Sequence, residues 1–128
     1  MPPSPSKPKS RARVEAHLGG HRGVALAALF LRANLYRIIE RRYKTTVGDI
    51  DIIATRFGTT VFIEVKARSK PVVEAEALQA VNRSRITRAA QYWLARHPNK
   101  AQTNFRFDVI FLAPGRWPRH VINAFDAS

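Results

Sequence analysis

The sequence contains no cysteine among its 128 residues. Disulfide bonds are therefore excluded, and so are zinc and iron–sulfur sites built on thiolate ligands. A chain of this length must be stabilised by a hydrophobic core, and a domain near this size buries roughly two-thirds of its unfolded surface. The lack of cysteine agrees with a reducing compartment, and we expect a cytoplasmic protein.

Acidic residues are scarce. Nine Asp and Glu stand against 22 Lys and Arg, which gives a formal net charge of +13. An excess of this size points to a polyanionic partner, with nucleic acid first and an anionic membrane surface second. The plain alternative is a protein that is basic without such a partner, as some ribosomal and secreted proteins are.

Long hydrophobic runs are missing as well. No apolar stretch approaches the roughly 20 residues that a membrane span needs. The stretch 24–31 (VALAALFL) ends at Arg32 without a small-residue cleavage pattern, so we interpret it as the buried face of a helix and not as a signal peptide. We expect no association with membranes.

Residues 1–13 differ in composition from the rest of the chain. This segment, MPPSPSKPKSRAR, holds four prolines and four basic residues but no acid. It cannot bury enough apolar surface to order itself. We predict a flexible basic tail over residues 1–13 and a single domain over residues 14–128.

The remaining chain alternates between helical and strand patterns. Composition and apolar spacing predict helices over 25–33 and 76–97, and strands over 35–42, 49–55, 60–67, 105–112 and 120–125. The short connection at 57–59 predicts that the second and third strands form an antiparallel hairpin. The order α-β-β-β-α-β-β predicts an α/β fold with a mixed central sheet flanked by helices.

Acids are concentrated in that hairpin. Asp49 and Asp51 are two residues apart in one predicted strand, and Glu64 and Lys66 are two residues apart in the next. Residues i and i+2 of a strand share a face, so a suitable register would bring Asp51 and Glu64 within reach of one metal ion. Two carboxylates about 4 Å apart repel by roughly 4 kcal/mol at an effective dielectric near 20, so such a cluster calls for a compensating cation. Mg²⁺ and Mn²⁺ both take carboxylate oxygens.

This arrangement is suited to hydrolysis of phosphodiester bonds. A metal-bound water has a lowered pKa and can attack phosphorus. A lysine such as Lys66, two residues after the glutamate, can orient that water or stabilise charge on the phosphate. The alternative is that these acids are ordinary strand residues on a solvated face, paired with some of the many arginines.

Several motifs together resemble a known family. The segments GDIDIIA (48–54), VFIEVKAR (61–68), RITRAAQYWL (85–94), FRFDVIF (105–111) and HVINAF (120–125) resemble the YraN-like family of predicted endonucleases, in the PD-(D/E)XK nuclease superfamily. The resemblance covers about residues 19–125. It implies a restriction-endonuclease-like fold, metal-dependent cleavage of DNA, branched or junction DNA as a candidate substrate, and a homodimer as in the junction resolvases.

The resemblance also assigns roles by position. It implies that Asp51 and Glu64 are the metal-binding acids and that Lys66 is the catalytic lysine. Asp49 stands where the family usually has a glutamate, and the backbone carbonyl of Val65 is implied as a further ligand of Mg²⁺ or Mn²⁺.

Two positions depart from the family's pattern. The first helix carries the acid-free stretch 23–26 where the family commonly has a glutamate, and a usual lysine near the start of the long helix is replaced by Asn82 or Arg83. Two alternatives to a nuclease therefore stay open. One is a non-catalytic nucleic-acid-binding protein on the same fold, and the other is a basic protein associated with RNA or the ribosome.

Basic residues flank the acids along the sequence. No acid occurs between Glu76 and Asp108, and a surface of one sign suits phosphates because each neutralised phosphate releases a counterion. Trp117, next to a Pro-Gly turn, is a candidate for stacking on a base. A solvated basic helix face is the alternative. The predicted nucleic-acid-binding residues are Arg41, Arg42, Lys44, Arg68, Arg83, Arg85 and Arg88.

Overall fold

The structure is a computed structural model that describes residues 20–67, 78, 81–101 and 103–126. Its elements are, in chain order, α2 (Gly20–Ala33), β1 (Arg37–Lys44), β2 (Asp49–Arg56), β3 (Thr59–Ala67), α4 (Arg83–Arg96), α5 (Pro98–Ala101), β4 (Asn104–Leu112) and β5 (Arg119–Phe125). The tail predicted over residues 1–13 lies outside the described residues. No helix in the described ranges is long and apolar enough to cross a membrane.

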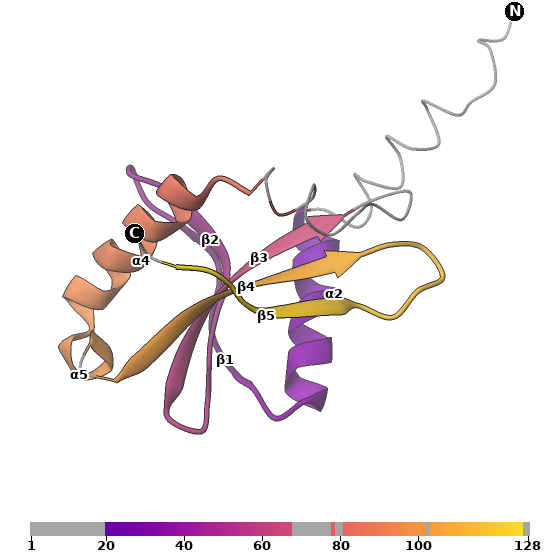
Figure 1. The fold of residues 1–128 in the computed structure, drawn as a ribbon, viewed down its shortest axis with the longest axis horizontal. Helices are drawn as coiled ribbons and strands as arrows, with labels where there is room; N and C mark the ends of the chain where they lie inside the picture. The colour runs from indigo at the N-terminus through magenta and orange to yellow at the C-terminus, as the bar shows by residue number, and fades with distance from the viewer. Residues whose placement is uncertain (1–19, 68–77, 79–80, 102, 127–128) are drawn as a thin grey trace, which may run out of the picture.

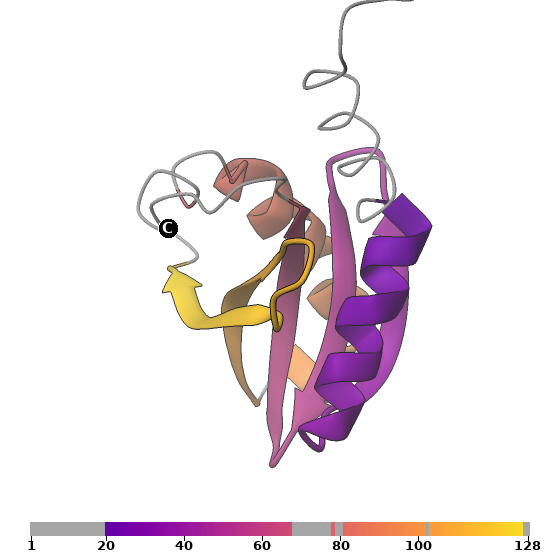
Figure 2. The ribbon, with the colours of Figure 1, turned by 90° about the vertical axis from the view of Figure 1, so that its right-hand side faces the viewer.

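The strands form one five-stranded mixed sheet in the order β1-β2-β3-β4-β5. Neighbouring strands are antiparallel except for β3 and β4, which run parallel and are joined through the segment that contains α4 and α5. A parallel pair requires such a crossover because its second strand must start at the same end as its first. Helices α2 and α4 cover opposite faces of the sheet (Figures 1 and 2). The predicted α/β fold with a mixed sheet is confirmed, and it is consistent with a restriction-endonuclease-like architecture.

Each face of the sheet carries its own hydrophobic core. Strand β2 supplies both, because Ile52 packs in the core under α2 and Ile53 packs in the core under α4. On the α2 side, Leu31 is fully buried, and on the α4 side Phe62 and Trp93 pack edge to face with ring centroids 5.9 Å apart. Burying one such side chain stabilises the fold by about 1.5–3 kcal/mol, so the two cores hold the strands in register.

The β2–β3 turn explains why these strands pair as a hairpin. Phe57 and Gly58 have φ angles of 51° and 80°. Two successive positive φ angles are typical of the type I′ turn, whose twist matches that of an antiparallel hairpin. The predicted antiparallel pairing of the second and third strands is therefore confirmed, with a two-residue turn.

The start of the long helix was predicted wrongly. Helix α4 begins at Arg83 and not at residue 76, because Val81 and Asn82 are not helical; residues 76, 77, 79 and 80 lie outside the described residues. The side chain of Asn82 accepts a hydrogen bond from the Arg85 N–H at 3.2 Å and caps the helix. Helix α2 starts earlier than predicted, at Gly20, and the short helix α5 was not predicted.

The turn between β1 and β2 packs tightly against the first turn of α4. A Cβ atom at Gly48 would lie only 2.0 Å from the backbone oxygen of Arg85. The turn is closed by Thr45, whose hydroxyl donates to the Gly48 carbonyl at 2.7 Å and accepts from the Gly48 N–H at 3.1 Å. Only glycine fits at position 48, and the contact fixes the start of α4 over the start of β2.

Candidate active site

The sheet opens between β2 and β3. Their pairing runs from the turn only as far as Ile52 and Ile63. Beyond this point residues 49 and 50 of β2 pair with β1, and residues 64–67 of β3 pair with β4. The two strands diverge there (Figure 1). We call the opening the fork, formed by residues 49–51 of β2 and residues 64–67 of β3.

Asp51 lies where the two strands separate. Its Oδ2 accepts a hydrogen bond from the Val65 N–H at 2.8 Å, so a side-chain oxygen supplies the acceptor that a paired strand would provide from its backbone. The N–H and C=O groups of one strand residue project to the same side. The Val65 carbonyl therefore faces the fork as well, on the same side as Asp51.

Glu64 and Asp51 are in contact across the fork. Glu64 lies close enough to Asp51 for hydrogen bonding and charge repulsion between the two carboxyl groups to affect its pKa. Burial, then the hydrogen bond and charge of Asp51, raise the pKa of Glu64 from its ordinary value near 4.5 to about 9, although the positive charge of Lys66 lowers it. With its pKa raised this far, Glu64 keeps its proton at neutral pH when no cation is bound, because burial and a neighbouring carboxyl group both disfavour its charged form.

The residues of the fork fit a hard divalent cation. Mg²⁺ in proteins is commonly held by one or two carboxylates, with waters and substrate phosphates completing its shell. Asp51 and Glu64 provide two carboxyl groups, and Val65 offers a carbonyl oxygen beside them. Across the described part of the chain, no group of three or more His, Asp or Glu side chains is placed to hold a metal ion. The fit therefore rests on a pair of acids and not on a larger cluster.

Asp49 is paired with a cation instead of joining the two fork acids. Its Oδ1 lies 2.7 Å from the Arg85 guanidinium of α4, and both side chains are about half exposed. Asp49 makes the smallest contribution to raising the pKa of Glu64. Its predicted role as an assisting metal ligand stays a prediction.

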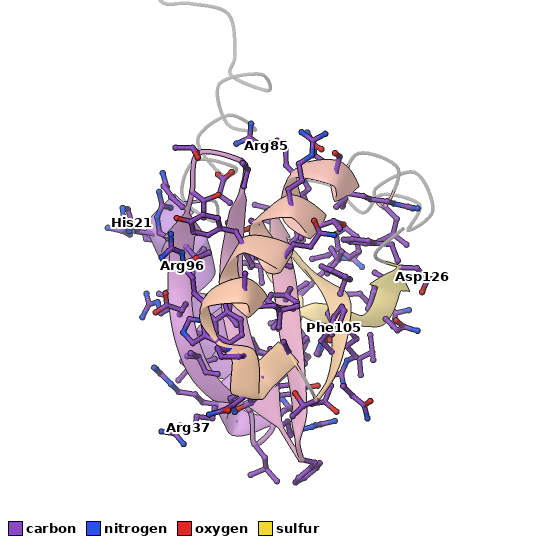
Figure 3. The ribbon with its side chains drawn as sticks, turned by 90° about the vertical axis from the view of Figure 1, so that its left-hand side faces the viewer. His21, Arg37, Arg85, Arg96, Phe105 and Asp126 are labelled. Atoms are coloured by element: carbon purple, nitrogen blue, oxygen red, sulfur yellow. The ribbon has the colours of Figure 1, made fainter. Side chains whose placement is uncertain are left out.

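The predicted basic residues lie on two elements beside the fork. On β1, Lys44 pairs with Asp49 and Arg41 pairs with Ile52, so both residues lie toward the fork end of the sheet, on the side of β2 that faces away from β3. Figure 3 shows Arg85 at the end of α4 near the fork, and Arg37 at the opposite end of the molecule. Arg68 lies outside the described residues. The exposed members are Arg41, Lys44, Arg83, Arg85 and Arg88, and Arg42 is half-buried.

Asp108 forms a second, separate polar centre. It is fully buried on β4 and accepts hydrogen bonds from Arg106 Nε at 3.0 Å and from the Asn123 N–H at 2.9 Å, and it contacts His120 Nε2 at 2.7 Å. Burial lowers the pKa of Arg106, but the hydrogen bond and charge of Asp108 outweigh it, so the pKa is raised. Asp108 is thus paired with basic side chains inside the sheet.

Sequence reasoning missed the place of the β4–β5 connection, residues 113–118. Because β4 runs parallel to β3, this connection leaves the sheet at the same end of the strands as the fork. Its Arg116 and Trp117 are exposed, and the exposure of Trp117 agrees with the expectation from its Pro-Gly neighbours. The run Arg-Trp-Pro-Arg (116–119) was the available signal, but the parallel pairing was needed to locate it.

Comparison with known proteins places these features in a family context. The model of the uncharacterised protein family UPF0102 matches residues 24–112, from α2 through the fork to the end of β4. A UPF0102 protein of Rhodopseudomonas palustris is 44% identical over 125 residues, covering 98% of this chain and 96% of the relative. One from a Bradyrhizobium species is 46% identical over 124 residues, with coverages of 97% and 91%. One from Mesorhizobium japonicum is 44% identical over 116 residues, with coverages of 91% and 93%.

Proposed function

Because the chain belongs to the uncharacterised protein family UPF0102, whose name states no activity, we propose its function from the fork itself. We propose that the protein is a divalent-metal-dependent endonuclease that hydrolyses phosphodiester bonds in DNA. The observation that carries the proposal is the contact between Asp51 and Glu64, two acids held against each other next to Lys66 where the sheet opens.

Each fork residue has a role in this proposal. Asp51 and Glu64 would hold Mg²⁺ or Mn²⁺, with the Val65 carbonyl as a further oxygen donor. The chemistry supplied by a bound ion is a more acidic water and compensation of charge on the scissile phosphate. Lys66 lies close enough to Glu64 to lower its pKa, and its ammonium would position a phosphate oxygen or the attacking water.

The charges around the fork support a polyanionic substrate. Lys44 of β1 is paired with Asp49 and is exposed, and the exposed Arg85 of α4 lies against the same residue at the start of β2. The net charge of +13 adds a long-range attraction. Backbone phosphates contacting these residues would release counterions, so binding should weaken as salt is raised.

The experiment is a cleavage assay with matched variants. The chain is incubated with linear duplex, nicked, single-stranded, flap and four-way-junction DNA, and with structured RNA, in Mg²⁺, Mn²⁺ or EDTA. Glu64→Gln and Asp51→Asn should each lower cleavage by about 100-fold or more, as expected when a charge-stabilising group is removed. Both should stay folded, judged by circular dichroism, and should still bind DNA.

The matched control is Glu40→Gln. Glu40 lies on β1, where it pairs with Ile53, so this variant makes the same chemical change on the same sheet outside the fork. It should cleave like the unchanged protein. Cleavage that survives in both fork variants, or that is lost equally in the control, would refute the proposal.

A second candidate is a non-catalytic nucleic-acid-binding protein on the same fold. It is favoured by α2, which contains no acidic residue that could add a third carboxylate. This candidate predicts salt-dependent DNA binding that EDTA leaves unchanged, and no cleavage of any substrate. Equal or tighter binding of structured RNA would favour a role with RNA or the ribosome.

A further inference from the structure

The β4–β5 connection presents the most exposed large hydrophobic side chain in the described part of the chain. Trp117 is 89% exposed, and within that part it has no hydrogen bond or ring contact. A single exposed apolar residue is normal on a protein surface. Trp117 is informative because of its position near the fork, the prolines that restrict its loop and the arginine beside it.

The strand register places Trp117 at the end of the sheet where the fork opens. Phe111 of β4 pairs with Lys66 of β3 on one side and with Arg119 of β5 on the other. The connection therefore begins just past the row that holds Lys66. With strands about 4.8 Å apart and residues about 3.3 Å apart along them, the backbone of Trp117 lies on the order of 10–15 Å from that of Lys66. Figure 1 shows the connection beyond the arrowheads of β3 and β4.

The connection is held in shape by two prolines and a turn. The Arg116 N–H donates to the Ala113 carbonyl at 3.3 Å, Pro114 follows Ala113, and Gly115 has a φ of 68°. Proline second and a positive φ third are typical of a type II turn. Pro118 restricts the backbone directly after Trp117. The indole is thus presented on a stiff loop, which lowers the entropy lost when it binds a partner.

The chemistry of this tip suits an unpaired nucleotide. An exposed indole offers a flat face for a base, and base–aromatic stacking tolerates any base. The guanidinium of exposed Arg116 beside it suits the neighbouring phosphate. Inside a duplex both faces of a base are already stacked on its neighbours, so Trp117 can stack only on a base that is unpaired or at an end.

We propose that the Arg116–Trp117 tip of the β4–β5 connection stacks on an unpaired base next to the fork, so that the substrate class is DNA with single-stranded or branched segments. This inference rests on the proposed function of the fork, because it assigns the substrate of that same site. Its test is therefore a binding measurement that does not depend on cleavage.

The opposite end of the sheet supplies a matched control. Phe57, at the β2–β3 turn, is 82% exposed and lies at the tip of a hairpin, as Trp117 does. The Arg56 guanidinium lies 5.2 Å from the centre of its ring and is tied to the Asn34 carbonyl at 3.1 Å. Phe57 therefore matches Trp117 in exposure and hairpin setting but lies at the end of the sheet away from the fork.

The experiment uses tryptophan fluorescence in the full chain carrying Asp51→Asn, in EDTA, so that no DNA is cut. The chain has two tryptophans, and Trp93 is buried, so a change on binding reports on Trp117. A single-stranded thymidine oligonucleotide should quench the emission, and a blunt duplex should not. Adding Trp117→Ala should abolish the quenching and weaken binding of the oligonucleotide on the order of tenfold.

Two further variants and the duplex make the result decisive. Trp117→Phe should keep part of the affinity for the oligonucleotide, and Phe57→Ala should leave it unchanged. Affinity for the blunt duplex should change by less than about twofold in each variant. The inference is overturned if Trp117→Ala weakens both probes equally or neither, or if Phe57→Ala has the same effect as Trp117→Ala.

The outcome separates this inference from the proposed nuclease function. Quenching by the oligonucleotide in a protein whose unchanged form cuts no DNA would refute the nuclease and support the stacking tip. Cleavage by the unchanged protein without any quenching would refute the stacking tip alone.

Discussion

Two acidic centres lie on neighbouring strands of one sheet, and the fold compensates only one of them. Asp108 on β4 is surrounded by donors from Arg106, His120 and the Asn123 backbone. Glu64 on β3 faces the carboxyl group of Asp51, and its pKa is raised to about 9. One carboxyl group thus meets positive charge and hydrogen-bond donors, and the other meets a second acid, whose effect outweighs the positive charge of Lys66.

The difference indicates which acid serves stability and which serves a ligand. A buried carboxylate costs several kcal/mol to desolvate unless partners offset that cost. At Asp108 the chain provides those partners itself. At the fork the compensation must come from a proton or from a cation in solution, so this pair is the candidate binding site. The predictions below test that distinction, beginning with the largest effect.

Replacing Asp108 should damage the fold. The variant Asp108→Ala leaves the partly buried Arg106 without its carboxylate and removes the acceptor for the Asn123 N–H, so the free energy of unfolding should fall by about 3–5 kcal/mol. Urea denaturation measures this change. Addition of Mg²⁺ should not restore the loss. A decrease of less than about 1 kcal/mol would mean that Asp108 is not the structural acid.

The fork should make stability depend on pH and on metal. The folded pKa of Glu64 is raised above its ordinary value, so its contribution to stability is complete below about pH 4.5 and is lost as pH rises toward 9. In EDTA the free energy of unfolding should therefore fall between these pH values. The expected fall is on the order of a few kcal/mol, because each unit of pKa difference corresponds to about 1.4 kcal/mol. Mg²⁺ should reverse the fall at the alkaline end.

The control for this pH dependence is Glu64→Gln, which cannot titrate. Its stability in EDTA should decline less between these pH values, and Mg²⁺ should stabilise it less. Parallel pH profiles for Glu64→Gln and the unchanged protein would contradict the raised pKa. Thermal unfolding at matched ionic strength provides the measurement.

The exposed pair of Asp49 and Arg85 should show the smallest effect on stability. Both side chains are about half exposed, so Arg85→Ala should cost less than about 1 kcal/mol of folding free energy. On the proposed nucleic-acid surface Arg85 contacts one phosphate, so the same variant should make the slope of log affinity for DNA against log salt shallower by about one. An unchanged slope would remove Arg85 from the nucleic-acid surface. Arg37→Ala, at the other end of the sheet, is the matched control.

The hairpin and its acids were predictable from sequence because the information is local. Apolar alternation marked both strands, and the short connection at 57–59 indicated that they pair as an antiparallel hairpin, while their register was left open. Once that turn is two residues long, Asp51 and Glu64 fall opposite each other. The sequence did not reveal that pairing ends at Ile52 and Ile63, because strand divergence depends on the twist of the whole sheet.

Features that depend on distant contacts were not predictable. The start of α4 was placed too early because residues 76–82 are mostly compatible with a helix, whereas the start follows the Asn82 cap and the contact of Arg85 with Gly48. Trp117 lies at the same end of the sheet as the fork because β3 and β4 pair in parallel, and these strands are separated by more than 30 residues of sequence. Local patterns carry no record of such pairings.

The close approach at Gly48 has a consequence for protein design. Arg85 meets two consecutive residues of the turn, its backbone oxygen against Gly48 and its guanidinium against Asp49. These neighbours together determine where the basic helix begins relative to the acid-bearing strand. A designer who transfers the acid pair to another α/β scaffold would therefore have to transfer this Gly-Asp step with it, because even an alanine at position 48 would push the helix off the strand.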